Sequence, residues 1–182
     1  MTPFRETIVR LARAELGVHE RPSNVVPYAP RVVRGGAWLR VQGLEWCARF
    51  ATDIVWRAWS LAVRGDRVFT ALPEALILGW RAEARGNLPP FTWRAAVSEV
   101  IRDARACGAW HDVTEAGEPL PGDLVCYFRA VNGVENDPRA GGAGHVAIDV
   151  GGGLVVSGND GDEVREAPRG KWRLCGWVRV EG

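Results

Sequence analysis

Several features that would each indicate a function are missing from this sequence. The four cysteines contain no Cys-x-x-Cys pair, which argues against a zinc ribbon or a dithiol redox site. No apolar run approaches about 18 residues, so we expect no transmembrane helix and no membrane partner. The formal net charge is only +1, so binding of nucleic acid through a strongly basic surface is not expected either.

The first residues of the chain show no secretion signal. They lack an apolar core and a small-residue cleavage site, and they lead directly into an amphipathic helical pattern. We therefore expect synthesis in the cytoplasm without a signal peptide. A substrate outside the cell would then be reached only after release, or after delivery by another system.

The composition fits one globular domain. The chain has 182 residues, 47% of them hydrophobic and 25% charged, which is enough for a real core. Helical periodicity dominates the first part, where Thr2 and Pro3 suit a helix start and Gly17 a helix end. We predict, in order, a helix over 3–16, a long loop over 18–44, a helix over about 47–62 and two helices within 70–107.

The rest of the chain alternates as strands do. Pro121 and Gly122 predict a type II turn before the first strand, and the three glycines at 151–153 predict a hairpin turn. Residues 130–144 predict a mobile loop with little to bury. Helices followed by antiparallel strands indicate an α+β fold. The predicted strands are 123–128, 145–150, 154–157 and 174–180.

Cys47 is the most informative residue, because it opens the apolar second helix. Unpaired backbone N–H groups and the positive end of the helix dipole favour the thiolate of a cysteine in that position. Cys126 and Cys175 instead lie within apolar strand patterns and are predicted to be small buried hydrophobes. Cys47 is therefore the candidate nucleophile.

His145 and Asn159 are the candidate partners of Cys47. His145 follows Gly144 at the start of a predicted strand, where an imidazole can act as a base. Asn159 follows the next strand, and a hairpin would return it beside His145 to accept its Nδ1–H. A polar turn is the simpler explanation of Asn159, and a buried thiol the simpler explanation of Cys47.

Five segments of the sequence resemble the CHAP peptidases (cysteine, histidine-dependent amidohydrolases/peptidases) and their NlpC-like relatives in the papain-like class. The resemblance covers most of the chain, and the segments occur in the family's order. They are ELGVHE at 15–20, WCARF at 46–50, PGDLV at 121–125, GHVAI at 144–148 and SGN at 157–159.

The resemblance implies a papain-like fold with N-terminal helices, in which the helix bearing the nucleophile packs on a small antiparallel sheet. It implies a single CHAP-like catalytic domain over 1–182, without the separate cell-wall-binding domain that often accompanies such domains. By this analogy Cys47 attacks an amide carbonyl, His145 acts as base and then as acid, and Asn159 orients His145. The Cys47 N–H would form part of an oxyanion hole.

The sequence departs from the family pattern close to the candidate nucleophile. Trp46 stands where many members carry glutamine, and Ser157 stands where many carry an acidic residue. Glu45 would raise the pKa of a neighbouring thiol unless it faces away. We expect Trp46, Ser157 and Gln42 to contribute to substrate binding, with Gln42 a candidate oxyanion donor.

The resemblance implies hydrolysis of an amide bond in the peptide part of peptidoglycan, by an enzyme of the phage-lysis, tail-associated or secreted-effector type. A secreted effector would have an inhibitor or immunity protein as a further partner. The same Cys-His pair also serves deamidases and transglutaminase-like enzymes with another acyl acceptor. A third interpretation is an inactive module that binds cell wall or a partner protein.

No cofactor is implied by a thiol mechanism, and we predict no metal site. The acidic run Asp160, Asp162 and Glu163 offers oxygen ligands for calcium, but a solvated turn explains it more simply. His19 and His111 lie in loop-like contexts and are not expected to take part in catalysis.

Overall fold

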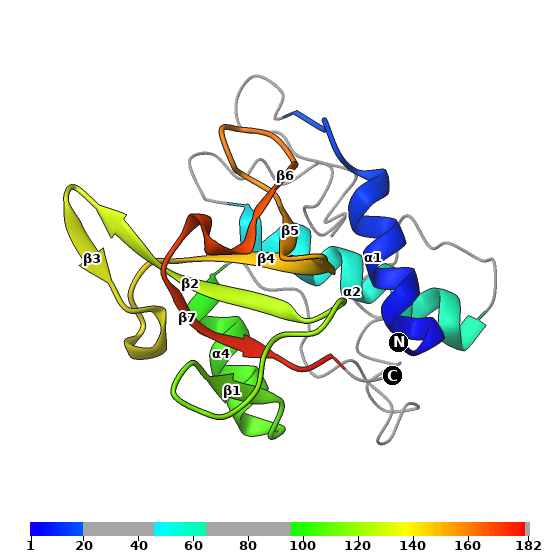
Figure 1. Cartoon of the computed structure of the whole chain (residues 1–182), viewed down its shortest axis with the longest axis horizontal. Coiled ribbons are helices and arrows are strands. Elements are labelled where there is room, and N and C mark those ends of the chain that lie inside the picture. Colours follow the sequence, from blue (N-terminus) through cyan, green and yellow to red (C-terminus); the bar gives the residue numbers. More distant parts are fainter. Residues whose placement is uncertain (20–45, 65–95, 181–182) are drawn as a thin grey trace, which may run out of the picture.

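The computed structural model describes residues 1–19, 46–64 and 96–180. In these residues three helices pack with a seven-stranded antiparallel sheet (Figure 1), which confirms the predicted α+β class. None of the described helices is long and apolar enough to cross a membrane. Gln42, the predicted first helix within 70–107 and nearly all of the predicted 18–44 loop lie outside the described residues.

Helix α1 (Pro3–Ala14) begins as its sequence predicts. The Thr2 hydroxyl accepts a hydrogen bond from the Arg5 amide at 3.4 Å, and Pro3 occupies the first turn, where no amide hydrogen is needed. Past the end of the helix, Gly17 adopts a left-handed conformation, and its amide donates to the Val164 carbonyl at 3.0 Å. The N-terminal helix is therefore tied to a segment near the other end of the chain.

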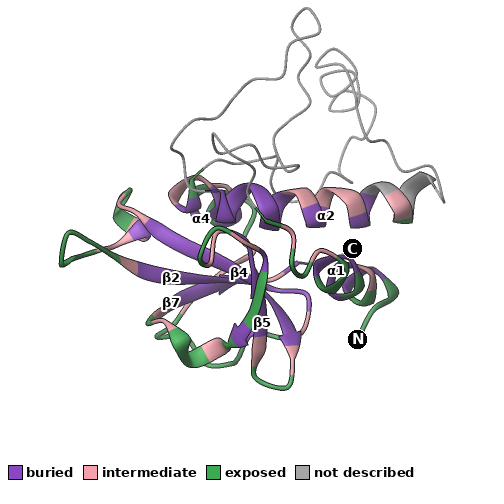
Figure 2. Cartoon of the chain, turned by 90° about the horizontal axis from the view of Figure 1, so that it is seen from above, coloured by how far each residue is buried: buried purple, intermediate pink, exposed green. Residues whose placement is uncertain are grey.

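Helix α2 (Cys47–Arg64) begins at the candidate nucleophile and matches the predicted second helix. Its fully buried residues recur at helical spacing and make one apolar face, which explains why this segment is a central helix. Figure 2 shows α2 and α4 (Val97–Ala106) on the same side of the sheet. The fully buried side chains of α2 are those of Ala48, Phe50, Ala51, Thr52, Ile54, Val55 and Ala58.

The strands pair in the order β1-β7-β2-β4-β5-β6, and β3 extends β2 as a hairpin. The predicted strands are confirmed as β2, β4, β5 and β7, and the predicted turn at Pro121-Gly122 closes with a hydrogen bond from Asp123 N to Leu120 O at 2.9 Å. The bounds are β1 Trp110–Asp112, β2 Leu124–Val131, β3 Val134–Asn136, β4 Gly144–Gly151, β5 Leu154–Ser157, β6 Arg165–Pro168 and β7 Leu174–Val178.

Alternation along the strands divides the sheet into two apolar faces. The face toward α2 carries Cys126, Val146, Ile148 and Val156, in one cluster with Cys47. The opposite face carries a smaller cluster, against which Trp172 of the β6–β7 connection and Leu174 of β7 pack. That smaller cluster consists of Val125, Tyr127, Ala147 and Val155.

The prediction that residues 130–144 have little to bury is confirmed, because only Pro138 and Gly144 are buried, but the segment is not a plain loop. This segment contains β3 and a short 3-10 helix (Pro138–Ala140), in which Pro138 is buried. Arg139 organises it, because its guanidinium pairs with Asp137 at 2.8 Å and with Asp112 at 3.1 Å. The same guanidinium lies 4.9 Å from the ring centre of Phe128. The 3-10 helix that precedes the candidate histidine is therefore held by the contacts of Arg139.

Candidate active site

The first turn of α2 is buried against the sheet. Trp46 and Cys47 are each only 2% exposed, and the helix starts with a hydrogen bond from Phe50 N to Trp46 O at 2.9 Å. The first backbone N–H groups of a helix have no partner within it, and no acidic residue stands in this first turn. The backbone therefore presents a positive field at Cys47, as the sequence predicts.

The residue after β5 packs directly on this helix start. A Cβ at Gly158 would lie 2.3 Å from the Trp46 indole and 2.8 Å from the Cβ of Phe50. Any larger residue at 158 would push the strand end away from α2. The end of β5 is therefore in close contact with the first turn of α2. The two contact residues, Trp46 and Phe50, stand on either side of Cys47 in the sequence.

The register of the central strands brings Asn159 toward His145. Ile148 of β4 pairs with Val156 of β5, and continuing that antiparallel register opposes His145 and Asn159. The strand itself ends at Ser157, and Asn159 adopts a left-handed conformation with φ of 60°. The segments that carry the three predicted catalytic residues thus meet at one end of the sheet.

The imidazole of His145 is buried beneath aromatic rings. It is 5% exposed, with ring centres of Trp172 at 4.5 Å and Tyr127 at 6.2 Å. Both rings belong to the face of the sheet away from α2, whereas the next residue, Val146, packs in the cluster with Cys47. The Nε2 atom has no hydrogen-bond partner in the described part of the chain, so neither Cys47 nor Asn159 bonds to that nitrogen.

Charges around His145 favour its neutral form. Burial lowers the pKa of His145 to about 4, and the positive charges of Arg129 and Lys171 lower it too, whereas the carboxylate of Asp160 raises it. Asp160 also pairs with Lys171 at 2.6 Å, and the Lys171 ammonium lies 4.7 Å from the ring centre of Trp172. At neutral pH the imidazole is therefore an unprotonated base.

The residues that enclose His145 were not predicted from the sequence. Asp160 directly follows Asn159, so the hairpin that was expected to bring Asn159 beside His145 could also have predicted Asp160 there. Trp172 and Lys171 come from the β6–β7 connection, and no local pattern connects them with His145. Of the residues predicted to bind substrate, Ser157 is fully buried and Trp46 is buried against Gly158. Gln42 lies outside the described residues.

All four cysteines lie in the described residues as thiols, without a disulfide between them. Cys107 is exposed, while Cys126 and Cys175 are fully buried, as predicted. Burial raises the pKa of Cys126 and raises that of Cys175 to about 12, which makes both thiols unreactive near neutral pH. A thiol of this protein that reacts near neutral pH must therefore be that of Cys47 or Cys107.

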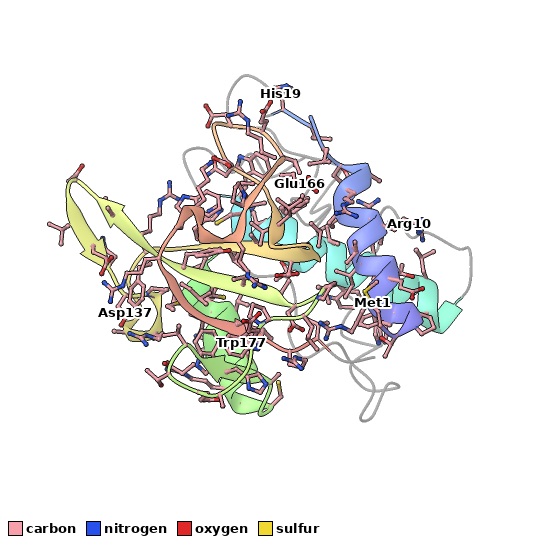
Figure 3. All side chains as sticks on the ribbon, in the orientation of Figure 1. Met1, Arg10, His19, Asp137, Glu166 and Trp177 are labelled. Carbon is pink, nitrogen blue, oxygen red and sulfur yellow. The ribbon has the colours of Figure 1, made fainter. Side chains whose placement is uncertain are left out.

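The other two histidines have partners elsewhere. His19 lies at the rim of the molecule (Figure 3), where its Nε2 is 2.9 Å from a carboxylate oxygen of Glu163. His111 stacks on Trp177, with ring centres 5.4 Å apart, and its Nδ1 is 3.3 Å from Glu115. Within the described residues, no group of three His, Cys, Asp or Glu side chains is arranged to hold a metal ion.

We predict that His145 makes folding stability fall with acid. The unfolded histidine has a pKa near 6.5 and the native one a pKa of about 4, so between these pH values only the unfolded state binds the proton. Stability is then fully present above about pH 6.5, and about 3 kcal/mol is lost as the pH falls through this window. Urea unfolding of wild type and His145→Gln at pH 7 and pH 4.5 measures this, and parallel losses in both proteins would contradict it.

Comparisons of the chain with protein-family models, with curated proteins and with solved structures found no match.

Proposed function

We propose that this chain is a papain-like cysteine amidohydrolase that cleaves an amide bond in the peptide part of peptidoglycan. The observation that carries the proposal is the meeting of three segments at one end of the sheet. They are the first turn of α2 with Cys47, the start of β4 with His145 and the turn after β5 with Asn159. A thiol, a base and an orienting amide are the parts that such a hydrolase needs.

In the proposed reaction the Cys47 sulfur attacks the scissile carbonyl, and His145 accepts the thiol proton. Because the imidazole packs with Tyr127 and Trp172 on the face of the sheet away from Cys47, this transfer requires the ring to turn toward α2 or a water between the two groups. The tetrahedral oxyanion is stabilised by backbone N–H groups at the start of α2. Collapse to a thioester releases the amine, which takes the proton from His145. Water then attacks the thioester, with His145 again as the base, and restores the Cys47 thiol.

The electrostatics of the described residues suit a neutral starting pair. His145 is unprotonated down to a pKa of about 4, so the base form is present throughout the neutral range. The helix dipole of α2 and the lack of an acidic residue in its first turn favour negative charge on Cys47. These features support attack by a thiol that gives up its proton as the reaction proceeds.

Peptidoglycan is proposed as the substrate because the five quoted segments resemble cell-wall hydrolases in their order along the chain. The same pair of residues could also transfer the acyl group to a different acceptor, as in a deamidase or a transglutaminase-like enzyme. The products separate these possibilities: hydrolysis of a wall peptide releases one new amino group and one new carboxylate for each bond.

A binding module without turnover is the second candidate, and the burial of Cys47 favours it. At 2% exposure the residue offers little surface to a substrate carbonyl. Such a module would bind wall fragments and leave Cys47 as part of the apolar cluster under α2.

Alkylation in a Cys107→Ala background tests the proposed function, because it removes the exposed thiol. We expect iodoacetamide to modify Cys47 near neutral pH, and the modified protein to release no amino groups from purified peptidoglycan. Mass spectrometry of the protein locates the adduct, and mass spectrometry of the products identifies the bond. An unreactive Cys47, together with intact wall binding, would select the binding module.

A further inference from the structure

Three buried polar atoms without a hydrogen-bond partner lie on the neighbouring strands β2, β4 and β5, on the face of the sheet away from α2. They are the Tyr127 hydroxyl, Nε2 of His145 and the Ser157 hydroxyl, and their side chains are 0%, 5% and 0% exposed. Buried polar groups are nearly always hydrogen-bonded, directly or through water. Three such atoms on adjacent strands of one sheet face need partners that the described side chains do not supply.

The strand register makes these residues neighbours. Tyr127 of β2 pairs directly with His145 of β4, and one further step of the β4–β5 register sets Ser157 opposite Ala147. Ala147 lies two residues after His145 and so shares its face. Its small side chain therefore lies on the same face, in the same apolar cluster as Tyr127.

Trp172 packs against two of these residues. Its ring centre lies 4.5 Å from that of His145 and 5.3 Å from that of Tyr127. Val125 and Val155 supply apolar groups on this face, and the ion pair of Asp149 and Arg169 acts electrostatically on the Tyr127 hydroxyl. A polar ligand held there would be surrounded by two hydroxyls and one ring nitrogen, which is the number of partners that a buried water usually has.

We propose that Tyr127 and Ser157 hold one buried water that accepts the hydrogen bond from Nε2–H of His145, and so act as positioning residues. The water accepts from Nε2–H and from the Tyr127 hydroxyl, and it donates to the Ser157 oxygen. This arrangement fixes the Nε2–H tautomer and leaves Nδ1 as the proton acceptor, so it replaces the Nδ1–H bond to Asn159 that the sequence predicts. The catalytic consequence rests on the proposed function, whereas the water site itself does not.

The chemistry of the two hydroxyls agrees with the state of the imidazole. Burial raises the pKa of Tyr127, so its hydroxyl remains a neutral donor throughout the working pH range. Neutral partners fix the orientation of an imidazole without stabilising its cation as a carboxylate would. His145 is then oriented as a base and stays unprotonated, which a carboxylate at the same place would oppose.

The tautomer of His145 is the direct test. Long-range ¹H–¹⁵N correlation spectra of uniformly labelled protein at pH 7 distinguish Nε2–H from Nδ1–H for each of the three histidines. We expect wild-type His145 to be mainly the Nε2–H form, and Tyr127→Phe and Ser157→Ala each to shift it toward Nδ1–H. Ser157→Thr keeps the hydroxyl and is expected to restore the wild-type signal. His19 and His111 serve as internal references.

Thr52→Val is the matched control, because it removes a buried hydroxyl on α2 that donates to the Ala48 carbonyl at 2.8 Å. It is expected to leave the His145 signal unchanged. The proposal is overturned if wild-type His145 is in the Nδ1–H form. It is also overturned if neither Tyr127→Phe nor Ser157→Ala changes the tautomer. Both replacements remove only an oxygen atom, and Ser157→Thr provides a second readout if Ser157→Ala does not fold.

Activity separates this inference from the proposed function. If the chain is the proposed hydrolase, Tyr127→Phe and Ser157→Ala are each expected to lower kcat about tenfold with little change in KM. A tautomer shift in a protein that cleaves no wall amide supports the water site and rejects the hydrolase. Cys47-dependent cleavage with an unaffected tautomer rejects the water site alone.

Discussion

Replacing Cys47 with alanine is expected to lower amide cleavage by about 1,000-fold or more, because removal of a covalent nucleophile leaves only binding and oxyanion stabilisation. The assay follows new amino groups released from purified peptidoglycan. The change removes one sulfur from a tightly packed cluster, so the variant must first be shown to remain folded. Cys47→Ser is the closer steric match and is expected to be almost as inactive, since a hydroxyl is a far weaker nucleophile near neutral pH.

Two other cysteines provide matched controls for Cys47→Ala. Cys107→Ala removes an exposed thiol and is expected to keep full activity. Cys126→Ala removes a fully buried thiol from the same cluster as Cys47, so it repeats the packing defect without touching the nucleophile. Equal losses in Cys126→Ala and Cys47→Ala would attribute the effect to packing, and activity that survives in Cys47→Ala would reject the thiol mechanism.

The elements that local sequence specifies were predictable. Helix α1 has its cap at Thr2, α2 has a repeating apolar face, and β4 and β5 are joined by three glycines that adopt left-handed conformations. Each signal lies within the element or directly beside it. The candidate site was predictable to the same extent, because Cys47, His145 and Asn159 stand at the ends of such elements.

The short strands were not predictable, because partners rather than local pattern decide them. In β6, Arg165 and Glu166 are exposed, and the strand exists because Val156 and Ser157 of β5 offer it an edge. Strands β1 and β3 have three residues each, too few for alternation to be recognised. The place of Trp172 over His145 likewise depends on how the β6–β7 connection crosses the sheet.

Asp123 is a buried carboxylate whose role could not be assigned from local pattern, because its partners lie far away along the chain. It follows the predicted turn at Pro121-Gly122, and its carboxylate connects α1 with the residues after β7. Its Oδ1 lies 2.7 Å from Arg5 of α1 and accepts from the Val180 amide at 3.3 Å. Its Oδ2 accepts from the Leu120 amide at 2.8 Å, and Nε of Arg179 lies 3.1 Å away in an ion pair outside hydrogen-bond geometry.

Asp123→Asn is therefore expected to destabilise the fold by about 3–5 kcal/mol, the usual cost of leaving a buried charge without its partner. Arg5 is 6% exposed, and its guanidinium would keep only the carbonyl oxygens of Leu120, Pro121 and Val180. Urea unfolding measures the change as a lower midpoint at constant slope. Glu135→Gln, which breaks an exposed pair with Arg173, is the matched control and is expected to cost less than about 1 kcal/mol. Similar losses in the two variants would show that Asp123 contributes no more than a surface ion pair, and the link between α1 and the end of the chain would then rest on apolar packing.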